Sequence, residues 1–141
     1  MNTTTIPKQE FLGSIERFQA NIKAAGLDAC PVHANESDMA NERYLSEYWP
    51  TFEAAALFVP AEGESALSVG TESDNYAAQW SVFANIEKMI EYREFAEAEC
   101  PGIVFASYRD IVAKYTPVLE VKKLGIVSWA ITPLPVHMSL N

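Results

Sequence analysis

Cysteine, histidine and glycine are scarce in this chain of 141 residues, which has two cysteines, two histidines and six glycines. Cys30 and Cys100 stand alone, without CxxC spacing, so they favour small buried thiols in a reducing compartment, although a disulfide between them stays open. A metal site needs three or four converging Cys, His, Asp or Glu ligands, and neither HxH nor HExxH spacing occurs. We therefore predict no metal ligand in this chain.

Patterns that carry catalysis are missing as well. The sequence has no GxSxG elbow, and its dispersed glycines form neither GxGxxG nor a P-loop. His33 is expected to be structural or exposed, His137 to be no ligand, and Glu94, Glu97 and Glu99 to be solvated loop carboxylates. We therefore predict no catalytic residue in these 141 positions.

Basic residues and long apolar runs are also few. Ten Lys and Arg stand against nineteen Asp and Glu, and the net charge of −9 repels phosphate backbones, which argues against a nucleic-acid partner. No apolar run approaches the roughly 20 residues of a membrane helix. The first ten residues, MNTTTIPKQE, lack the charged and apolar regions of a secretory signal. We expect a cytoplasmic protein without a membrane span.

What the sequence does contain is an alternation of helical and strand patterns. Apolar side chains recur at spacings of three and four between Pro7 and Gly26, which predicts an amphipathic helix over 7–26. A short helix capped by Ser37 or Asp38 should lead into Tyr44. Further helices are predicted at 73–84, with Trp80 facing inward, and at 107–116, capped by Ser107. Strands are predicted at 27–34, 53–59, 64–70, 88–95 and 122–130.

The order of these segments predicts an α/β domain. The turn PAEG at 60–63 joins two apolar strands into a β-hairpin, and the intervening helices imply a parallel crossover. We expect a mixed sheet of about five to six strands flanked by helices. The last segment, PLPVHMSLN at 133–141, is typical of the first turn of a helix that the chain end leaves unfinished.

Aromatic side chains crowd the segment between the first strand and the hairpin. Tyr44, Tyr48, Trp49 and Phe52 lie there, next to Arg43. Two interpretations stay open: the rings cover one end of the sheet, or they contact a ligand or a second subunit.

Three segments together resemble the N-terminal domain of the creatinase, prolidase and aminopeptidase P family: AAGLDACPVH, NERYLSEYWP and EAAALFVPAEGESALSV. The matching residues are Gly26, Leu27, Asp28 and Ala29, then Asn41, Tyr44, Leu45 and Ser46, then Val59, Pro60 and Gly63. The resemblance covers nearly the whole chain and makes residues 1–141 one such domain. It departs at Glu47, where the family has Gly. Because Glu takes a positive φ less cheaply than Gly, we expect the local turn to differ.

The resemblance implies a ribonuclease-H-like layout and a catalytic domain with the "pita-bread" fold that would follow this chain. That domain would hold two divalent metal ions (Mn, Co or Zn) and cleave Xaa-Pro or related C–N bonds. The chain itself would be inactive. Its partners would be its own C-terminal catalytic domain and a second copy in a homodimer. The residues Tyr48, Trp49 and Phe52 would then be substrate-entrance or dimer contacts, shaping a pocket for a small apolar group such as a proline ring.

The alternative is a stand-alone α/β module that binds a small ligand or a protein partner. A further reading frame after Asn141, with the spaced metal ligands, would decide for the hydrolase, and a stop codon would decide for the module. An independent enzyme with a ribonuclease-H-like carboxylate site is disfavoured, because the predicted strands carry few acids. Asp28 stands at a strand start, where a turn or cap role explains it better.

Overall fold

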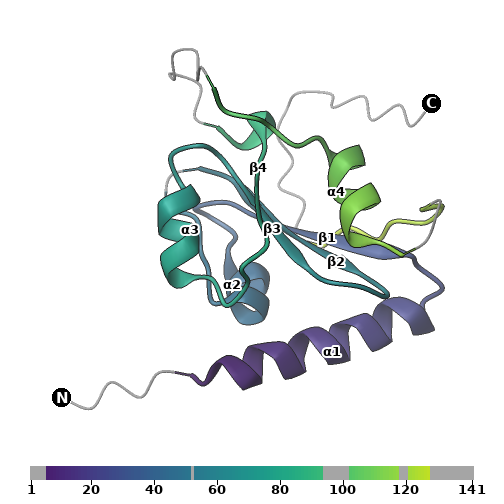
Figure 1. Cartoon of the computed structure of the whole chain (residues 1–141). Helices are drawn as coiled ribbons and strands as arrows, with labels where there is room; N and C mark the ends of the chain where they lie inside the picture. Colours follow the sequence, from purple (N-terminus) through teal and green to yellow (C-terminus); the bar gives the residue numbers. More distant parts are fainter. Residues whose placement is uncertain (1–5, 52, 94–101, 118–120, 128–141) are drawn as a thin grey trace.

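The structure of the chain is a computed structural model, and it describes residues 6–51, 53–93, 102–117 and 121–127 (Figure 1). Its elements are α1 (Lys8–Ala24), β1 (Ala29–Ala34), α2 (Ala40–Ser46), β2 (Ala55–Pro60), β3 (Ala66–Val69), α3 (Asp74–Trp80), β4 (Ile86–Lys88), the 3-10 helix η1 (Ile90–Tyr92) and α4 (Tyr108–Tyr115). No helix among these residues is long and apolar enough to cross a membrane.

The strands form one mixed sheet in the order β1-β2-β3-β4, which confirms the predicted α/β architecture. The predicted hairpin is the antiparallel pair of β2 and β3, and β1 also runs antiparallel to β2. The crossover through α3 places β4 parallel to β3, with Leu67 opposite Ile86. The described sheet has four strands, fewer than the five to six expected.

Two segments account for the difference in strand number. The predicted strand 88–95 is wrong over residues 89–93, because the buried side chains of Met89 and Tyr92 stand three residues apart and form a 3-10 turn, and residues 94 and 95 lie outside the described residues. The predicted strand 122–130 runs parallel beside β1, but only through isolated bridges from Ala29 to Leu124 and from Val32 to Val127. Residues 128–130, like the expected final helical turn at 133–141, lie outside the described residues.

Asp28 anchors this last segment to β1. Its carboxylate accepts hydrogen bonds from the backbone N–H groups of Lys122 at 2.7 Å and Lys123 at 2.8 Å. These two bonds, that of Lys123 first, hold the pKa of Asp28 below its usual value. The aspartate of the matched GLDA segment therefore has a structural role, as its position at a strand start suggested.

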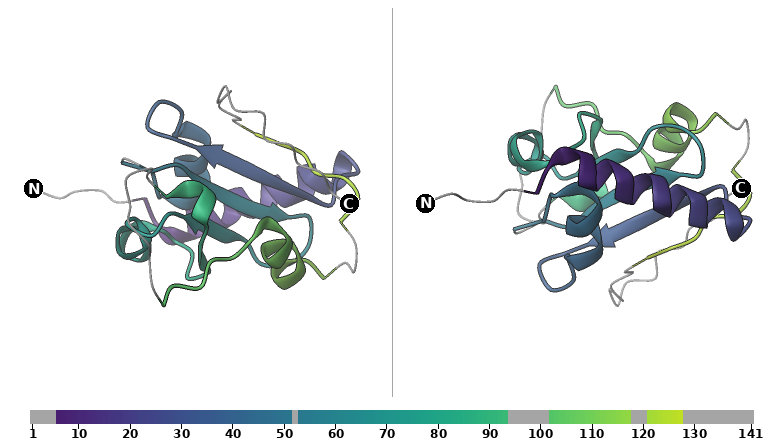
Figure 2. Two further views of the ribbon diagram at one scale, coloured as in Figure 1. Left: turned by 90° about the horizontal axis from the view of Figure 1, so that it is seen from above. Right: turned by 90° about the horizontal axis from the view of Figure 1, so that it is seen from below.

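The sheet separates two apolar layers. Alternate side chains such as Val32, Leu57 and Val69 pack against α1, α2 and α3 on one face. Phe58 and Ala66 pack against η1 and α4 on the other face. Figure 2 shows α1 crossing the first face along its length, with α4 on the opposite side. Because both faces are covered, every residue of β2 and β3 is buried.

The predicted helix caps are partly correct. Ser107 forms a full capping box with Asp110 at the start of α4, as expected. Met39 precedes α2, so the prediction of Ser37 or Asp38 as its cap is wrong. The reason is local: the Asn35 side chain accepts the backbone N–H groups of both residues and holds them in a turn before the helix.

Glu47 ends α2 in the left-handed conformation, with φ 64° and ψ −18°, and its N–H bonds to the carbonyl of Arg43 at 3.0 Å. The expectation that this turn would differ is therefore wrong, since Glu47 adopts the backbone conformation that favours Gly. Replacing Glu47 by Gly should raise the free energy of unfolding by about 1 kcal/mol, because the Cβ strain disappears. Urea denaturation measures this change.

Glu47→Ala is the matched control for that substitution. It removes the charge but keeps the Cβ atom, so it should bring little or none of the stabilisation. Equal stabilities of Glu47→Gly and Glu47→Ala would show that the left-handed backbone costs this protein nothing.

Candidate functional site

The predicted entrance residues separate in the structure. Tyr48 is fully buried in the layer under α1, edge-to-face with Tyr76 at 5.8 Å between ring centroids. Burial raises the pKa of Tyr48 to about 12. Trp49 is half-buried and reaches a surface groove. Phe52 lies outside the described residues. Their contact with a substrate or a second subunit stays a prediction. Of the two residues that the structure describes, only Trp49 reaches the surface and could make such a contact directly.

Trp49 belongs to an aromatic cluster that joins the end of α2 to α3. Its ring lies 6.0 Å from Tyr76 and 6.0 Å from Trp80, and the guanidinium carbon of Arg43 lies 4.4 Å from its centroid. A guanidinium at that distance makes a cation–π contact. Trp80 is 43% exposed, so the prediction that it faces inward is wrong. It packs on Trp49 at the surface because Ala77, one turn earlier, takes the core position.

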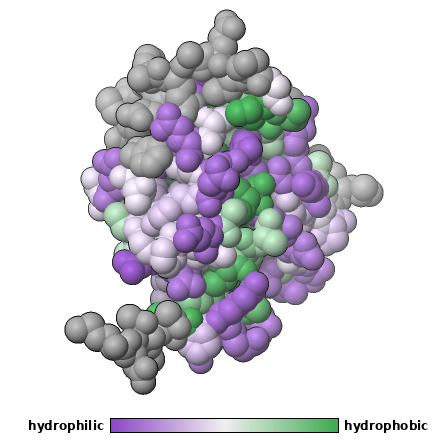
Figure 3. All heavy atoms as spheres, turned by 60° about the vertical axis from the view of Figure 1, so that its left-hand side comes forward, coloured by the Kyte–Doolittle hydropathy of each residue, from purple (hydrophilic) through white to green (hydrophobic). Residues whose placement is uncertain are grey.

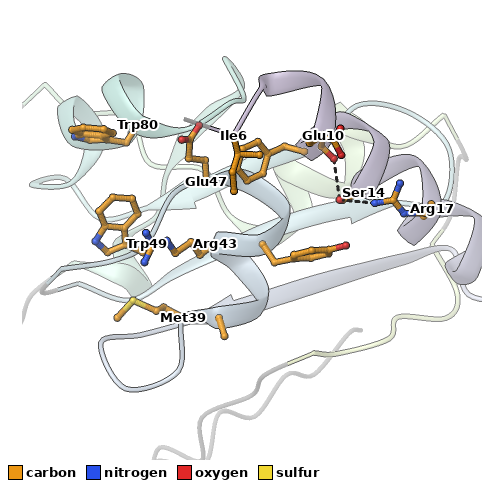
Figure 4. A pocket seen from close by; sticks show the side chains of 12 residues that line it. Ile6, Glu10, Ser14, Arg17, Met39, Arg43, Glu47, Trp49 and Trp80 are labelled. Carbon is orange, nitrogen blue, oxygen red and sulfur yellow. Dashed lines mark hydrogen bonds between the residues drawn. The ribbon is translucent and has the colours of Figure 1, made fainter. Parts of the chain in front are cut away.

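The groove beside this cluster runs between α1 and α2 and has a volume of about 820 Å³. Trp49 and Trp80 stand at one end and Arg17 at the other (Figure 4). Phe11 and Met39 supply apolar surface between them. On the side of the molecule that carries α2 and α3, apolar surface forms a strip between polar patches (Figure 3). A groove of this size suits a small ligand or a short peptide.

Two guanidinium groups, those of Arg17 and Arg43, line the groove together with the carboxylates of Glu10 and Glu47. Arg17 donates to the Ser14 hydroxyl at 2.9 Å, and Ser14 in turn donates to the carbonyl of Glu10 at 3.0 Å. Ser14 and then Arg17 lower the pKa of the exposed Tyr44 hydroxyl. Within the described residues, neither Arg17 nor Arg43 forms an ion pair, so both can receive a ligand carboxylate.

Behind the groove, buried polar side chains gather at one end of the sheet. Glu42 on α2 is fully buried, and burial raises its pKa well above 4.5. Glu53 is also buried and accepts the backbone N–H of Ser73 at 3.1 Å. Gly70 makes room for it, because a Cβ there would lie 2.3–2.5 Å from the Glu53 carboxyl atoms. Sequence reasoning missed Glu42, since a glutamate in a short helix is usually exposed.

Ser46, one of the family-matching residues, ties α2 to its surroundings. Its hydroxyl donates to the carbonyl of Glu42 at 2.8 Å and accepts the N–H of Tyr48 at 3.2 Å. Its own carbonyl accepts the N–H of Val82 at 3.0 Å. These bonds fix the direction in which the chain leaves α2 and therefore place Trp49.

The histidines, cysteines and acidic residues of the described ranges do not gather into a metal site. No three His, Cys, Asp or Glu side chains in these ranges lie close enough to hold an ion. His33 on β1 packs instead against the ring of Tyr92, 5.3 Å between centroids, and burial lowers its pKa. Cys30 is a buried free thiol whose pKa burial raises, and Cys100 lies outside the described residues.

The solved structures that align with this chain include peptidases and the N-terminal domain of a peptidase. A dipeptidase, PepE, from Mycobacterium ulcerans aligns with a TM-score of 0.51 and 17% identity over 59% of this chain and 23% of its own. The N-terminal domain of the cytoplasmic peptidase PepQ from Mycobacterium tuberculosis H37Rv aligns at 0.46 and 26%, over 60% and 57%. A proline dipeptidase from Streptococcus pneumoniae aligns at 0.44 and 20%, over 51% of both chains.

The chain thus spans about a quarter of the PepE chain and just over half of each of the other two. No curated protein matches the sequence. The model of the Creatinase/Prolidase N-terminal domain matches residues 14–140, which is almost the whole sequence. This match agrees with the GLDA, YLS and hairpin segments and with the mixed sheet described above. The chain therefore belongs to the creatinase/prolidase N-terminal domain family.

Proposed function

We propose that this chain is the non-catalytic N-terminal domain of a metal-dependent Xaa-Pro dipeptidase, aminopeptidase P or creatinase-like hydrolase. It would support dimerisation and wall the entrance of the active site. Its partners would be its own C-terminal catalytic domain and a second copy of the protein. Family membership supports this division of labour. We also propose a cytoplasmic location, with which the free buried thiol of Cys30 agrees.

The observation that carries the proposal is the groove with Trp49 and Trp80 at one end and two guanidinium groups along it that form no ion pair among the described residues. Indole faces pack well against a compact apolar ring such as that of proline. A guanidinium binds a carboxylate, the group in which a dipeptide ends. The chemistry of the groove therefore matches an Xaa-Pro dipeptide. Trp49 would contact the proline ring and Arg43, which stacks on Trp49, would bind the carboxylate.

The proposed hydrolase also needs metal ions, and the residues described here do not fit them, because no three candidate ligands converge. We therefore assign the two divalent ions (Mn, Co or Zn) to the catalytic domain. This chain would bind the substrate and exclude bulk water from it, and it would not activate the attacking water.

Two measurements test the proposal. The reading frame after Asn141 should continue with a catalytic domain that carries spaced Asp, Asp, His, Glu and Glu residues. The complete protein should hydrolyse Xaa-Pro dipeptides when manganese, cobalt or zinc is added, and the 141-residue chain should not. Stoichiometric metal binding and hydrolysis by the 141-residue chain alone would contradict it.

The stand-alone binding module is the second candidate, because the groove is complete within this one chain and falls in the size range of small-molecule sites. A stop codon directly after Asn141, together with binding of a carboxylate ligand by the isolated chain, would decide for it.

A further inference from the structure

Glu42 is the most unusual buried group in the described part of the chain. Its residue is 0% exposed, and neither carboxyl oxygen has a hydrogen-bond partner among the described residues. Buried carboxyl groups are normally paired, because leaving one unpaired costs free energy and ionising it costs much more. The position is therefore stable only while Glu42 carries its proton, and burial accordingly raises its pKa well above 4.5.

The groups that face Glu42 do not stabilise its charge. The loop after α2 presents Tyr48, and η1 presents Tyr92. Burial raises the pKa of both tyrosines, and the Glu42 charge raises it further. β1 contributes His33 beside Tyr92, and burial lowers its pKa, so it too is favoured without charge. Among the described residues, no lysine or arginine offsets the effect of burial on the Glu42 pKa. Loss of the proton thus places an uncompensated negative charge among neutral neighbours.

The helix that carries Glu42 also forms one wall of the groove. Arg43, the next residue, stacks on Trp49, and Met39 and Glu47 line the same space from either end of α2. The helix has only seven residues and ends in the left-handed Glu47. A short element with backbone strain at its end is among the first parts of a fold to open locally.

We propose that Glu42 is a protonation-controlled latch: its uncharged carboxyl lets α2 pack against the sheet, and loss of the proton releases α2 together with the Arg43–Trp49 stack. The wall that α2 gives the groove is thereby ordered in the protonated protein and loosened in the ionised one. This inference goes beyond the proposed function and does not rest on it, because the release of α2 and Trp49 can be measured in the absence of any substrate.

Tryptophan fluorescence tests the latch directly. A Trp129→Phe background leaves Trp49 and Trp80 as the only reporters. Acrylamide quenching is measured from about pH 5 to about pH 9, the span over which buried carboxyls in proteins ionise. We expect the quenching constant to rise at least about twofold in a one-proton transition, as locally opened segments expose their side chains. Far-UV circular dichroism over the same range should stay constant.

Substitutions identify the titrating group. Glu42→Gln and Glu42→Leu should abolish the transition, whereas Glu36→Gln in the exposed turn and His33→Gln should keep it. The protection factors of the α2 amides in the unsubstituted chain, which correct for the base-catalysed intrinsic rate at each pH, should fall about tenfold across the same transition, and this decides the matter even if a Glu42 variant fails to fold. A flat quenching profile with unchanged α2 protection factors, or a transition that persists in Glu42→Gln, would overturn the latch.

Discussion

Replacing Tyr48 by alanine is expected to lower the free energy of unfolding by about 3–5 kcal/mol. Tyr48 is fully buried in the layer beneath α1 and packs edge-to-face on Tyr76. Removing its ring leaves a cavity between α2, β2 and α3, whose lining loses both apolar burial and dispersion contacts. Urea denaturation followed by circular dichroism measures the loss.

Two variants make this result specific. Tyr48→Phe keeps the ring and should cost less than about 1.5 kcal/mol, because only the hydroxyl is lost. Trp49→Ala, at the next position, should destabilise the chain less than Tyr48→Ala, because Trp49 is only half-buried. If Tyr48→Ala left stability unchanged, Tyr48 would not be a core residue and its assignment as an entrance contact would regain weight.

Glu42→Leu is expected to stabilise the protein by about 1–3 kcal/mol at neutral or alkaline pH, because an unpaired buried carboxyl is replaced by an apolar side chain. The sign depends on pH through the raised pKa. Between 4.5 and the folded pKa, the folded state binds a proton that the unfolded state lacks. The stability that the Glu42 proton provides is thus fully present below pH 4.5 and is lost as the pH rises through the folded pKa.

The measurement is the difference in the free energy of unfolding between Glu42→Leu and the unsubstituted chain at several pH values. Other groups, such as Asp28 and His33 with their lowered pKa values, contribute equally to both proteins and cancel. The advantage of Glu42→Leu should be smaller at acid pH and grow toward alkaline pH. A pH-independent difference would show that Glu42 ionises normally in the folded state.

The sequence predicted most of the helices and strands because their patterns are local. The helix starting after Pro7, the hairpin around Gly63 and the capping box at Ser107 each depend on residues a few positions apart. The prediction of a strand over 88–95 was wrong over the described residues 89–93. The apolar residues there fit both a strand period and a helical period, and the packing of Tyr92 beneath α4 favours the 3-10 turn.

The candidate site was less predictable, because it depends on contacts between distant segments. The aromatic segment and Trp49 could be read from the sequence, but the groove also needs Phe11 of α1 and Trp80 of α3. Nothing local shows that Tyr48 turns inward while Trp49 turns outward. The burial of Glu42 could not be predicted from the sequence either. It results from the packing of α2 on the sheet, and helical propensity does not determine that packing.

The most direct test of this account is the KM of the complete protein for an Xaa-Pro dipeptide, measured with and without the substitution Trp49→Ala. We predict a KM about tenfold higher with a nearly unchanged kcat, because Trp49 would bind the substrate without taking part in the chemistry. Glu36→Gln serves as the control and should leave both constants unchanged. An unchanged KM in Trp49→Ala, or a loss confined to kcat, would contradict the claim that this domain walls the entrance of the active site.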